Sequence, residues 1–164
     1  MVKGESVPSD DDVTRWIKPK LIGKDDDGNV VLNEYGQPAV VAPQAFSLSD
    51  DEDGLSVTWL QRFGLDRPVH LPLAAEAFRQ SIPSQRLSAK SAFAIGKVSS
   101  ILERGRQHGS KLRVVQDPID GNAGHAEIRR YPRELGLLQE ALANEVFSER
   151  HLYASISGSL KLRP

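Results

Sequence analysis

Residues 91–115, with the sequence SAFAIGKVSSILERGRQHGSKLRVV, contain the pattern that decides the fold class. The apolar run at 92–95 suits a buried strand. Residues 98–107 have apolar side chains at helical spacing and predict a helix, which ends at His108 and Gly109. Residues 112–115 form a second β-branched run and predict another strand. Strand, helix and strand within about 25 residues are compatible with a crossover unit and equally with a mixed sheet, so both alternatives stay open.

The segments on either side of this stretch predict further strands and helices. Between residues 16 and 46, short β-branched runs alternate with Asp-Gly and Tyr-Gly turn signals, which is typical of hairpin strands. At 56–64, Ser56 is suited to cap a short helix and Gly64 to end it. Further elements are predicted as a helix over 73–81 with Pro72 in its first turn, a helix over 133–147, and a final strand over 151–156.

These elements predict an α+β fold in one compact domain, with a mixed or mainly antiparallel sheet and three to four helices packed against it. The 164 residues are enough to bury a core without a metal or disulfide. Residues 1–12 are polar and acidic and are expected to be poorly ordered. Residues 13–157 are expected to form the domain, and residues 158–164 a C-terminal tail.

Composition excludes several classes of site. The chain has no cysteine, which excludes disulfides, thiolate zinc sites and cysteine nucleophiles. The acidic first residues do not resemble a signal peptide, and no stretch approaches the ~20 apolar residues of a membrane span. We therefore expect a cytoplasmic protein that does not cross a membrane.

The net charge of -1 conceals an uneven distribution of charge. Residues 1–55 carry 12 acidic and 5 basic side chains, whereas residues 56–164 carry 10 acidic and 16 basic ones. The acidic residues come in runs that keep loops solvated, repel nucleic acid, or compete for a basic surface. Because the basic residues are scattered and the net charge is near zero, nucleic-acid binding is possible but not favoured.

The densest group of polar residues, 117–129, offers a candidate catalytic site. If residues 125–129 are extended, His125, Glu127 and Arg129 share one face. A histidine beside a carboxylate can act as a general base, here with Asp117 or Asp120 as a further acid. The alternative is an ordinary edge strand with a surface ion pair. The residues predicted to hold an anionic substrate are Arg62, Lys90, Asn122 and Arg129.

Trp59 and Phe63 are the candidate anchors for a protein partner. Both are large aromatic residues, and aromatic side chains often act as anchors at binding interfaces because they bury a large area. The alternative is that the predicted short helix needs both side chains for its own packing.

These patterns lead to two hypotheses of function. The leading one is an accessory or interaction protein acting through a protein partner, because cofactor loops, nucleophile elbows and metal spacings are absent from the sequence. The alternative is a small hydrolase or nuclease-like enzyme acting on a phosphate-containing substrate through His125, Glu127 and Asp117. No cofactor is predicted, although a divalent cation held by carboxylates and imidazole is possible.

Overall fold

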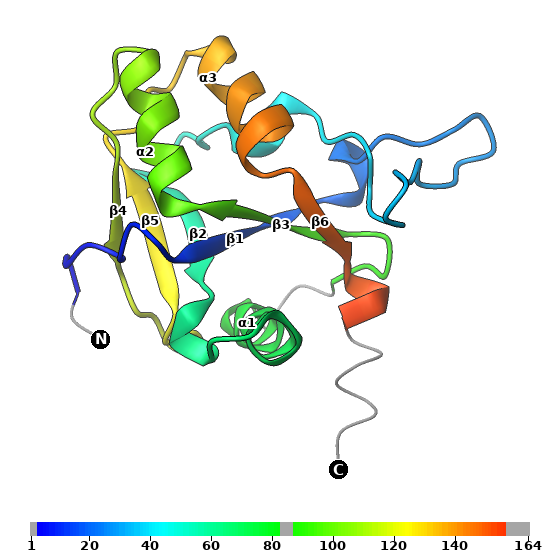
Figure 1. Ribbon diagram of the computed structural model, residues 1–164, viewed down its shortest axis with the longest axis horizontal. Coiled ribbons are helices and arrows are strands. Elements are labelled where there is room, and N and C mark those ends of the chain that lie inside the picture. Colours follow the sequence, from blue (N-terminus) through cyan, green and yellow to red (C-terminus); the bar gives the residue numbers. More distant parts are fainter. Residues whose placement is uncertain (1–2, 83–86, 157–164) are drawn as a thin grey trace.

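A six-stranded sheet forms the centre of the protein in the computed structural model, which describes residues 3–82 and 87–156 (Figure 1). The strand order is β4-β5-β2-β1-β3-β6, and each neighbouring pair is antiparallel. The predicted α+β fold is therefore confirmed, in its mainly antiparallel form. The strands are β1 (Asp12–Ile17), β2 (Leu55–Trp59), β3 (Ala92–Lys97), β4 (Arg113–Gln116), β5 (His125–Arg129) and β6 (Glu149–Leu152).

Helices cover both faces of this sheet. Helix α1 (Arg67–Ser81) lies on one face, and α2 (Val98–Gln107) and α3 (Gly136–Ala141) lie on the other (Figure 1). A π-helical turn, Leu142–Val146, continues α3. The described residues also include three short 3-10 turns, η1 (Pro19–Leu21), η2 (Pro43–Phe46) and η3 (Gln61–Phe63), and a helical segment at 153–156.

Strand β3 contributes side chains to two apolar cores, one on each face of the sheet. Ala92 and Ala94 belong to the apolar cluster beneath α2 and α3, whereas Phe93 and Ile95 belong to the cluster beneath α1. A strand covered on both faces must be apolar throughout, which is why this segment was recognisable from its sequence. Helix α2 then joins β3 to β4, which run in the same direction with β1, β2 and β5 between them.

The helix predicted over residues 56–64 is wrong, because Leu55–Trp59 is strand β2 and only a 3-10 turn follows it. Leu55 and Val57 are buried in the α2-side core, whereas the intervening Ser56 is half-buried, so the segment alternates with the two-residue period of a strand. Pairing with β1 on one side and β5 on the other satisfies its backbone. Tertiary pairing therefore outweighs the local cap and glycine signals.

Other predicted boundaries also shift. Helix α1 begins at Arg67, so Pro72 lies inside it and not in its first turn. The helix predicted over 133–147 begins only at Gly136, and the strand predicted over 151–156 is displaced to Glu149–Leu152. Between residues 18 and 54 the structure has isolated bridges and 3-10 turns in place of the hairpin strands that were predicted.

The N-terminal residues 4–7 run along the outer edge of β4. The amide of Gly4 donates to the Gln116 carbonyl over 2.7 Å, and the amide of Val7 donates to the Val114 carbonyl over 2.9 Å. The Val7 side chain is buried. This pairing covers an edge that would otherwise expose unpaired backbone groups. The predicted tail, residues 158–164, lies outside the described residues, and no helix among the described residues is long and apolar enough to span a membrane.

Candidate functional site

An arm formed by residues 23–41 projects from the body of the protein between η1 and η2 (Figure 1). An isolated bridge between Ile22 and Val41 closes its base. Within the arm, the amide of Val31 donates to the Gly23 carbonyl over 3.1 Å, and the amide of Ala39 donates to the Val31 carbonyl over 2.8 Å. The arm is therefore held by its own backbone hydrogen bonds, although it contains no regular strand.

The first turn of the arm is built around Asp25. Its carboxylate Oδ1 accepts hydrogen bonds from the amides of Asp27 and Asn29, at 3.0 and 2.9 Å. The backbone closes the same turn, because the Asp25 amide donates to the Asn29 carbonyl over 2.8 Å. Gly28 has a φ of 82°, the left-handed conformation that glycine adopts without strain.

The second turn repeats this design around Asn33. Its amide oxygen accepts from the backbone amides of Tyr35 and Gln37, at 2.9 and 3.0 Å, and Gly36 has a φ of 73°. The turn signals recognised in the sequence therefore do form turns, and both are fixed by a short polar side chain four residues before the turn ends.

Arg150, on β6, holds the arm to the body. Arg150 is only 5% exposed, and its guanidinium donates to the main-chain carbonyls of Pro38 and Ala39 on the arm, at 3.2 and 2.9 Å. It also donates to the carbonyls of Ala143 and Phe147 beside the π-helical turn. Burial lowers the pKa of Arg150 below its ordinary value. Four directed bonds from one planar group fix the direction in which the arm projects.

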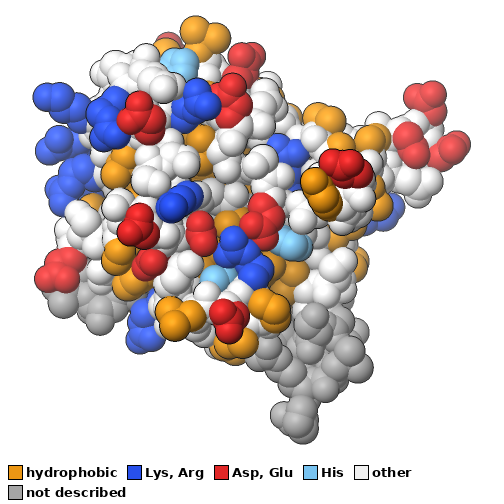
Figure 2. All heavy atoms as spheres, viewed as in Figure 1, with side chains coloured by type: hydrophobic (Ala, Val, Ile, Leu, Met, Phe, Trp, Pro, Cys, Tyr) orange, Lys and Arg blue, Asp and Glu red, His pale blue; other side chains and the backbone are white. Residues whose placement is uncertain are grey.

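The arm presents apolar side chains beside an acidic turn. Tyr35 is 77% exposed, Val40 52% and Leu32 50%. Within the arm, Lys24 is outnumbered by the carboxylates of residues 25–27 and 34. Acidic side chains stand at the far end of the projection, with hydrophobic side chains nearer the body (Figure 2).

Comparisons with protein-family models, curated proteins and solved structures find no match.

The structure brings together three of the residues predicted for catalysis or substrate binding. Nδ1 of His125 lies 2.7 Å from the main-chain oxygen of Asp117 and 3.4 Å from its carboxylate. Because a carbonyl only accepts, Nδ1 carries a proton and donates a hydrogen bond to the Asp117 carbonyl. Asn122 is buried beside them, donating to the Thr58 hydroxyl over 3.0 Å and accepting from the Gly124 amide.

His125 faces little free space. The adjoining cavity measures about 20 Å³ and is lined by residues that include Thr14, Thr58 and Phe93. A space of this size holds about one water molecule. Next along β5, Glu127 and Arg129 pair with each other at 3.2 Å, on the face that the two-residue alternation predicted.

The other predicted site residues lie elsewhere. Lys90 precedes β3, three strands from β5 and at the opposite end of the sheet from His125. Arg62 is exposed on η3, and Asp120 is exposed in the turn after β4. Among the described residues no group of three or more His, Asp or Glu side chains is arranged to hold a metal ion.

Trp59 and Phe63 point into the protein. The Trp59 indole N–H donates to the Asp11 carboxylate over 2.9 Å, and both side chains are half-buried. Phe63 packs so closely on Gly124 that a Cβ there would lie 2.4 Å from its ring. Their contacts correspond to the packing role considered as the alternative. Of the exposed large apolar side chains, four (Val31, Leu32, Tyr35 and Val40) lie on the arm, and others, Leu65 and Leu137 among them, lie on the body.

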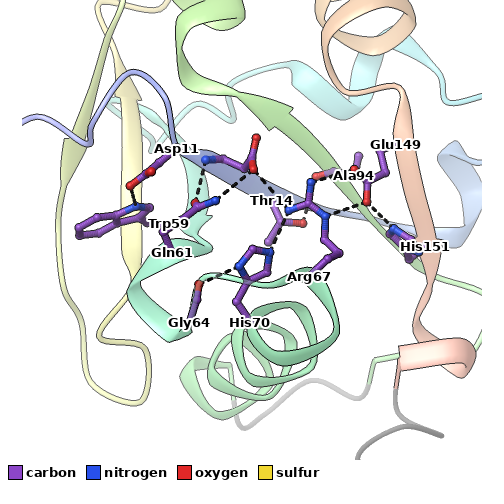
Figure 3. A network of polar contacts seen from close by, with 11 residues as sticks. Asp11, Thr14, Trp59, Gln61, Gly64, Arg67, His70, Ala94, Glu149 and His151 are labelled. Carbon is purple, nitrogen blue, oxygen red and sulfur yellow. Dashed lines mark hydrogen bonds and ion pairs between the residues drawn. The ribbon is translucent and has the colours of Figure 1, made fainter.

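A network of ion pairs around Arg67 joins the start of α1 to β1 and β6 (Figure 3). Arg67 forms two parallel hydrogen bonds of 2.9 Å with the Glu149 carboxylate and lies 3.4 Å from Asp12. His151 also hydrogen-bonds Glu149, at 2.7 Å. Burial raises the pKa of Glu149, but the bonds from His151 and Arg67 outweigh it, so that the pKa lies below its ordinary value.

His70 completes this network as a buried neutral ring. Its Nε2 lies 2.9 Å from Arg67 Nη1, which can only donate, so Nε2 accepts and Nδ1 donates to the Gly64 carbonyl. With both ring nitrogens occupied, His70 has no free group for acid–base chemistry. Arg67 and Glu149 are 82 positions apart, so no local sequence pattern indicated the network.

Proposed function

We propose that the protein is an accessory protein that binds a protein partner through the arm, residues 23–41. The observation that carries this proposal is the exposure of Tyr35, Leu32 and Val40 on a projection that is fixed at its base. Solvent-exposed apolar side chains on an ordered projection are typical of interaction sites. The proposal keeps the predicted class of function and moves the contact surface from Trp59 and Phe63 to the arm.

The partner that fits this arm has an apolar surface bordered by lysine or arginine side chains. Tyr35 and Leu32 supply the apolar contact, and the carboxylates at 25–27 lie on the same arm to meet basic residues. Because the turns at Asp25 and Asn33 are ordered in the free protein, little conformational entropy is lost on binding. A cytoplasmic location, predicted from the sequence, remains part of this proposal and is tested by cell fractionation.

Site-specific photo-crosslinking in cells tests the surface directly. A benzophenone amino acid at position 35 should trap a specific protein, whereas the same group at position 137 should not. Leu137 is the matched control because it is also a large, exposed apolar side chain, at 65%, but lies on α3. Equal yields of the same products from both positions would contradict the proposal.

The trapped protein, once purified, allows the affinity to be measured. We expect the pair Tyr35→Ser and Leu32→Ser to weaken binding at least about tenfold, because interface anchors contribute about 2 kcal/mol or more each. The control pair Leu65→Ser and Leu137→Ser should bind normally. Thermal unfolding should be the same for all variants, because these side chains are exposed. Unchanged affinity in the arm variant would overturn the assignment.

A further inference from the structure

The sheet opens between β1 and β2. The two strands pair only at Val13 with Trp59 and Thr14 with Thr58, although β1 continues to Ile17 and β2 begins at Leu55. A cavity of about 420 Å³ adjoins this opening, lined by Arg15 and Trp16 from β1, by Ser56 from β2, and by η1, the segment from η2 to Glu52, and α1. Pockets of this volume accommodate small organic molecules.

Arg15 brings hydrogen-bond donors to this cavity. Its Nε donates to the Ala45 carbonyl over 2.6 Å, and its Nη1 donates to the Ser56 carbonyl over 2.8 Å. A guanidinium has five N–H groups. The remaining three have no acceptor among the described residues, and no carboxylate in that part of the chain lies within ion-pair distance of Arg15.

Two lysines add positive charge to the same cavity. Lys18 and Lys20 line it, and within residues 3–82 and 87–156 neither makes an ion pair or a side-chain hydrogen bond. Glu52 is the acidic side chain of the lining; it accepts from the amide and hydroxyl of Ser49 at Oε1 and acts electrostatically on Arg15, so that three cations face one carboxylate. The lining therefore has an excess of uncommitted cationic donors, which favours an anionic ligand.

The apolar part of the lining indicates that the ligand is organic. Trp16 and Phe78 lie side by side with ring centroids 5.5 Å apart. The Trp16 indole N–H is buried and has no hydrogen-bond partner among the described residues. Because this N–H is inaccessible to solvent, it is the two aromatic rings that supply the apolar contact for an organic ligand.

We propose that this cavity binds a small organic oxyanion, with its phosphate or carboxylate group on Arg15, Lys18 and Lys20 and its apolar part against Trp16 and Phe78. This site is separate from the arm, so the two proposals succeed or fail independently. Phosphate and carboxylate groups each present two oxygens that can accept parallel hydrogen bonds from one guanidinium.

Fluorescence of Trp16 provides the test, using the full chain with Trp59→Phe so that Trp16 is its one tryptophan. The probes are phenyl phosphate and benzoate, with phenol as the uncharged control. Arg15 is left intact because it also supports the backbone at Ala45 and Ser56. The variant pair is Lys18→Gln with Lys20→Gln, and the matched control is Lys97→Gln with Lys111→Gln, which removes the same charge outside the cavity.

We expect a saturable fluorescence change with at least one anionic probe and none with phenol. The variant at 18 and 20 should bind at least about tenfold more weakly, which corresponds to about 1.4 kcal/mol, and the control pair should bind as the parent does. Tighter binding of phenyl phosphate than of benzoate would assign phosphoryl ligands, and the reverse would assign carboxylates. No saturation, an equal response to phenol, or equal weakening by both lysine pairs would overturn the proposal.

Discussion

Replacing Arg150 with methionine tests how the arm is held to the body. Methionine keeps a long unbranched side chain and so retains most of the packing of the arginine stem. The substitution removes the side-chain hydrogen bonds to the carbonyls of Pro38 and Ala39 on the arm, and to those of Ala143 and Phe147 on the body. These four carbonyls have no replacement donor in the methionine side chain.

The expected loss follows from this inventory. A buried carbonyl left without its donor costs about 1–3 kcal/mol, which gives a gross loss of at least about 4 kcal/mol. Part of this is offset, because a buried guanidinium without a carboxylate partner is itself costly to desolvate. We therefore expect Arg150→Met to lower the free energy of unfolding by about 2–4 kcal/mol, a large share of the about 5–15 kcal/mol typical of a domain.

Urea unfolding followed by circular dichroism measures this loss, and hydrogen exchange locates it. The amides of Val31 and Ala39 bond within the arm and should exchange faster in the variant. The matched control is Arg106→Met, because Arg106 pairs with Glu103 on α2 and its side chain is 62% exposed. The control should change stability by less than about 1 kcal/mol. A loss below about 1 kcal/mol in Arg150→Met, with unchanged exchange in the arm, would refute the role assigned to this residue.

Two further predictions concern the body of the protein. Gly124→Ala should destabilise it by about 1–3 kcal/mol in urea unfolding, because the new methyl group would lie 2.4 Å from the Phe63 ring, whereas Gly136→Ala should be tolerated because nothing lies within 4 Å. The lowered pKa of Glu149 contributes stability that is complete above its ordinary value of 4.5 and is lost as the pH falls through the folded-state value. The difference in unfolding free energy between the wild type and Glu149→Gln should therefore shrink as the pH falls below about 4.5; a difference that grows as the pH falls below that value would contradict this assignment.

Elements with one strong local period could be predicted from the sequence. Helix α2 (Val98–Gln107) has the predicted bounds, and β5 has the predicted alternation, with Ala126 and Ile128 buried and His125 half-buried. In β2 the local signals conflicted. Serine and glycine at suitable positions favoured a helix, whereas β-branched Val57 and Thr58 favoured a strand. Only the pairing with two neighbouring strands decided between them.

The arm attachment and the cavity could not be predicted, because each depends on groups that are distant in sequence. Arg150 bonds carbonyls 111 and 112 positions earlier, and main-chain acceptors leave no mark on the sequence at those positions. The cavity depends on where the pairing of β1 and β2 ends, which follows from the strand order. The sequence indicated an acidic turn at 25–27, but it did not indicate that this turn lies on an arm held to the body by Arg150.

The two arginines that support irregular backbone differ in how fully their donors are used, and this difference separates a structural role from a binding role. Arg150 makes four hydrogen bonds to carbonyls and is almost fully buried, so that it has little capacity left for a ligand. Arg15 makes two such bonds and lines a cavity with Lys18 and Lys20. The lining of that cavity holds three cations and one carboxylate, Glu52, which acts electrostatically on Arg15, so positive charge is in excess and an entering anion would offset it. The excess positive charge of this lining would therefore favour an anionic ligand, whereas the charge at Arg150 is already directed at the four backbone carbonyls that it holds.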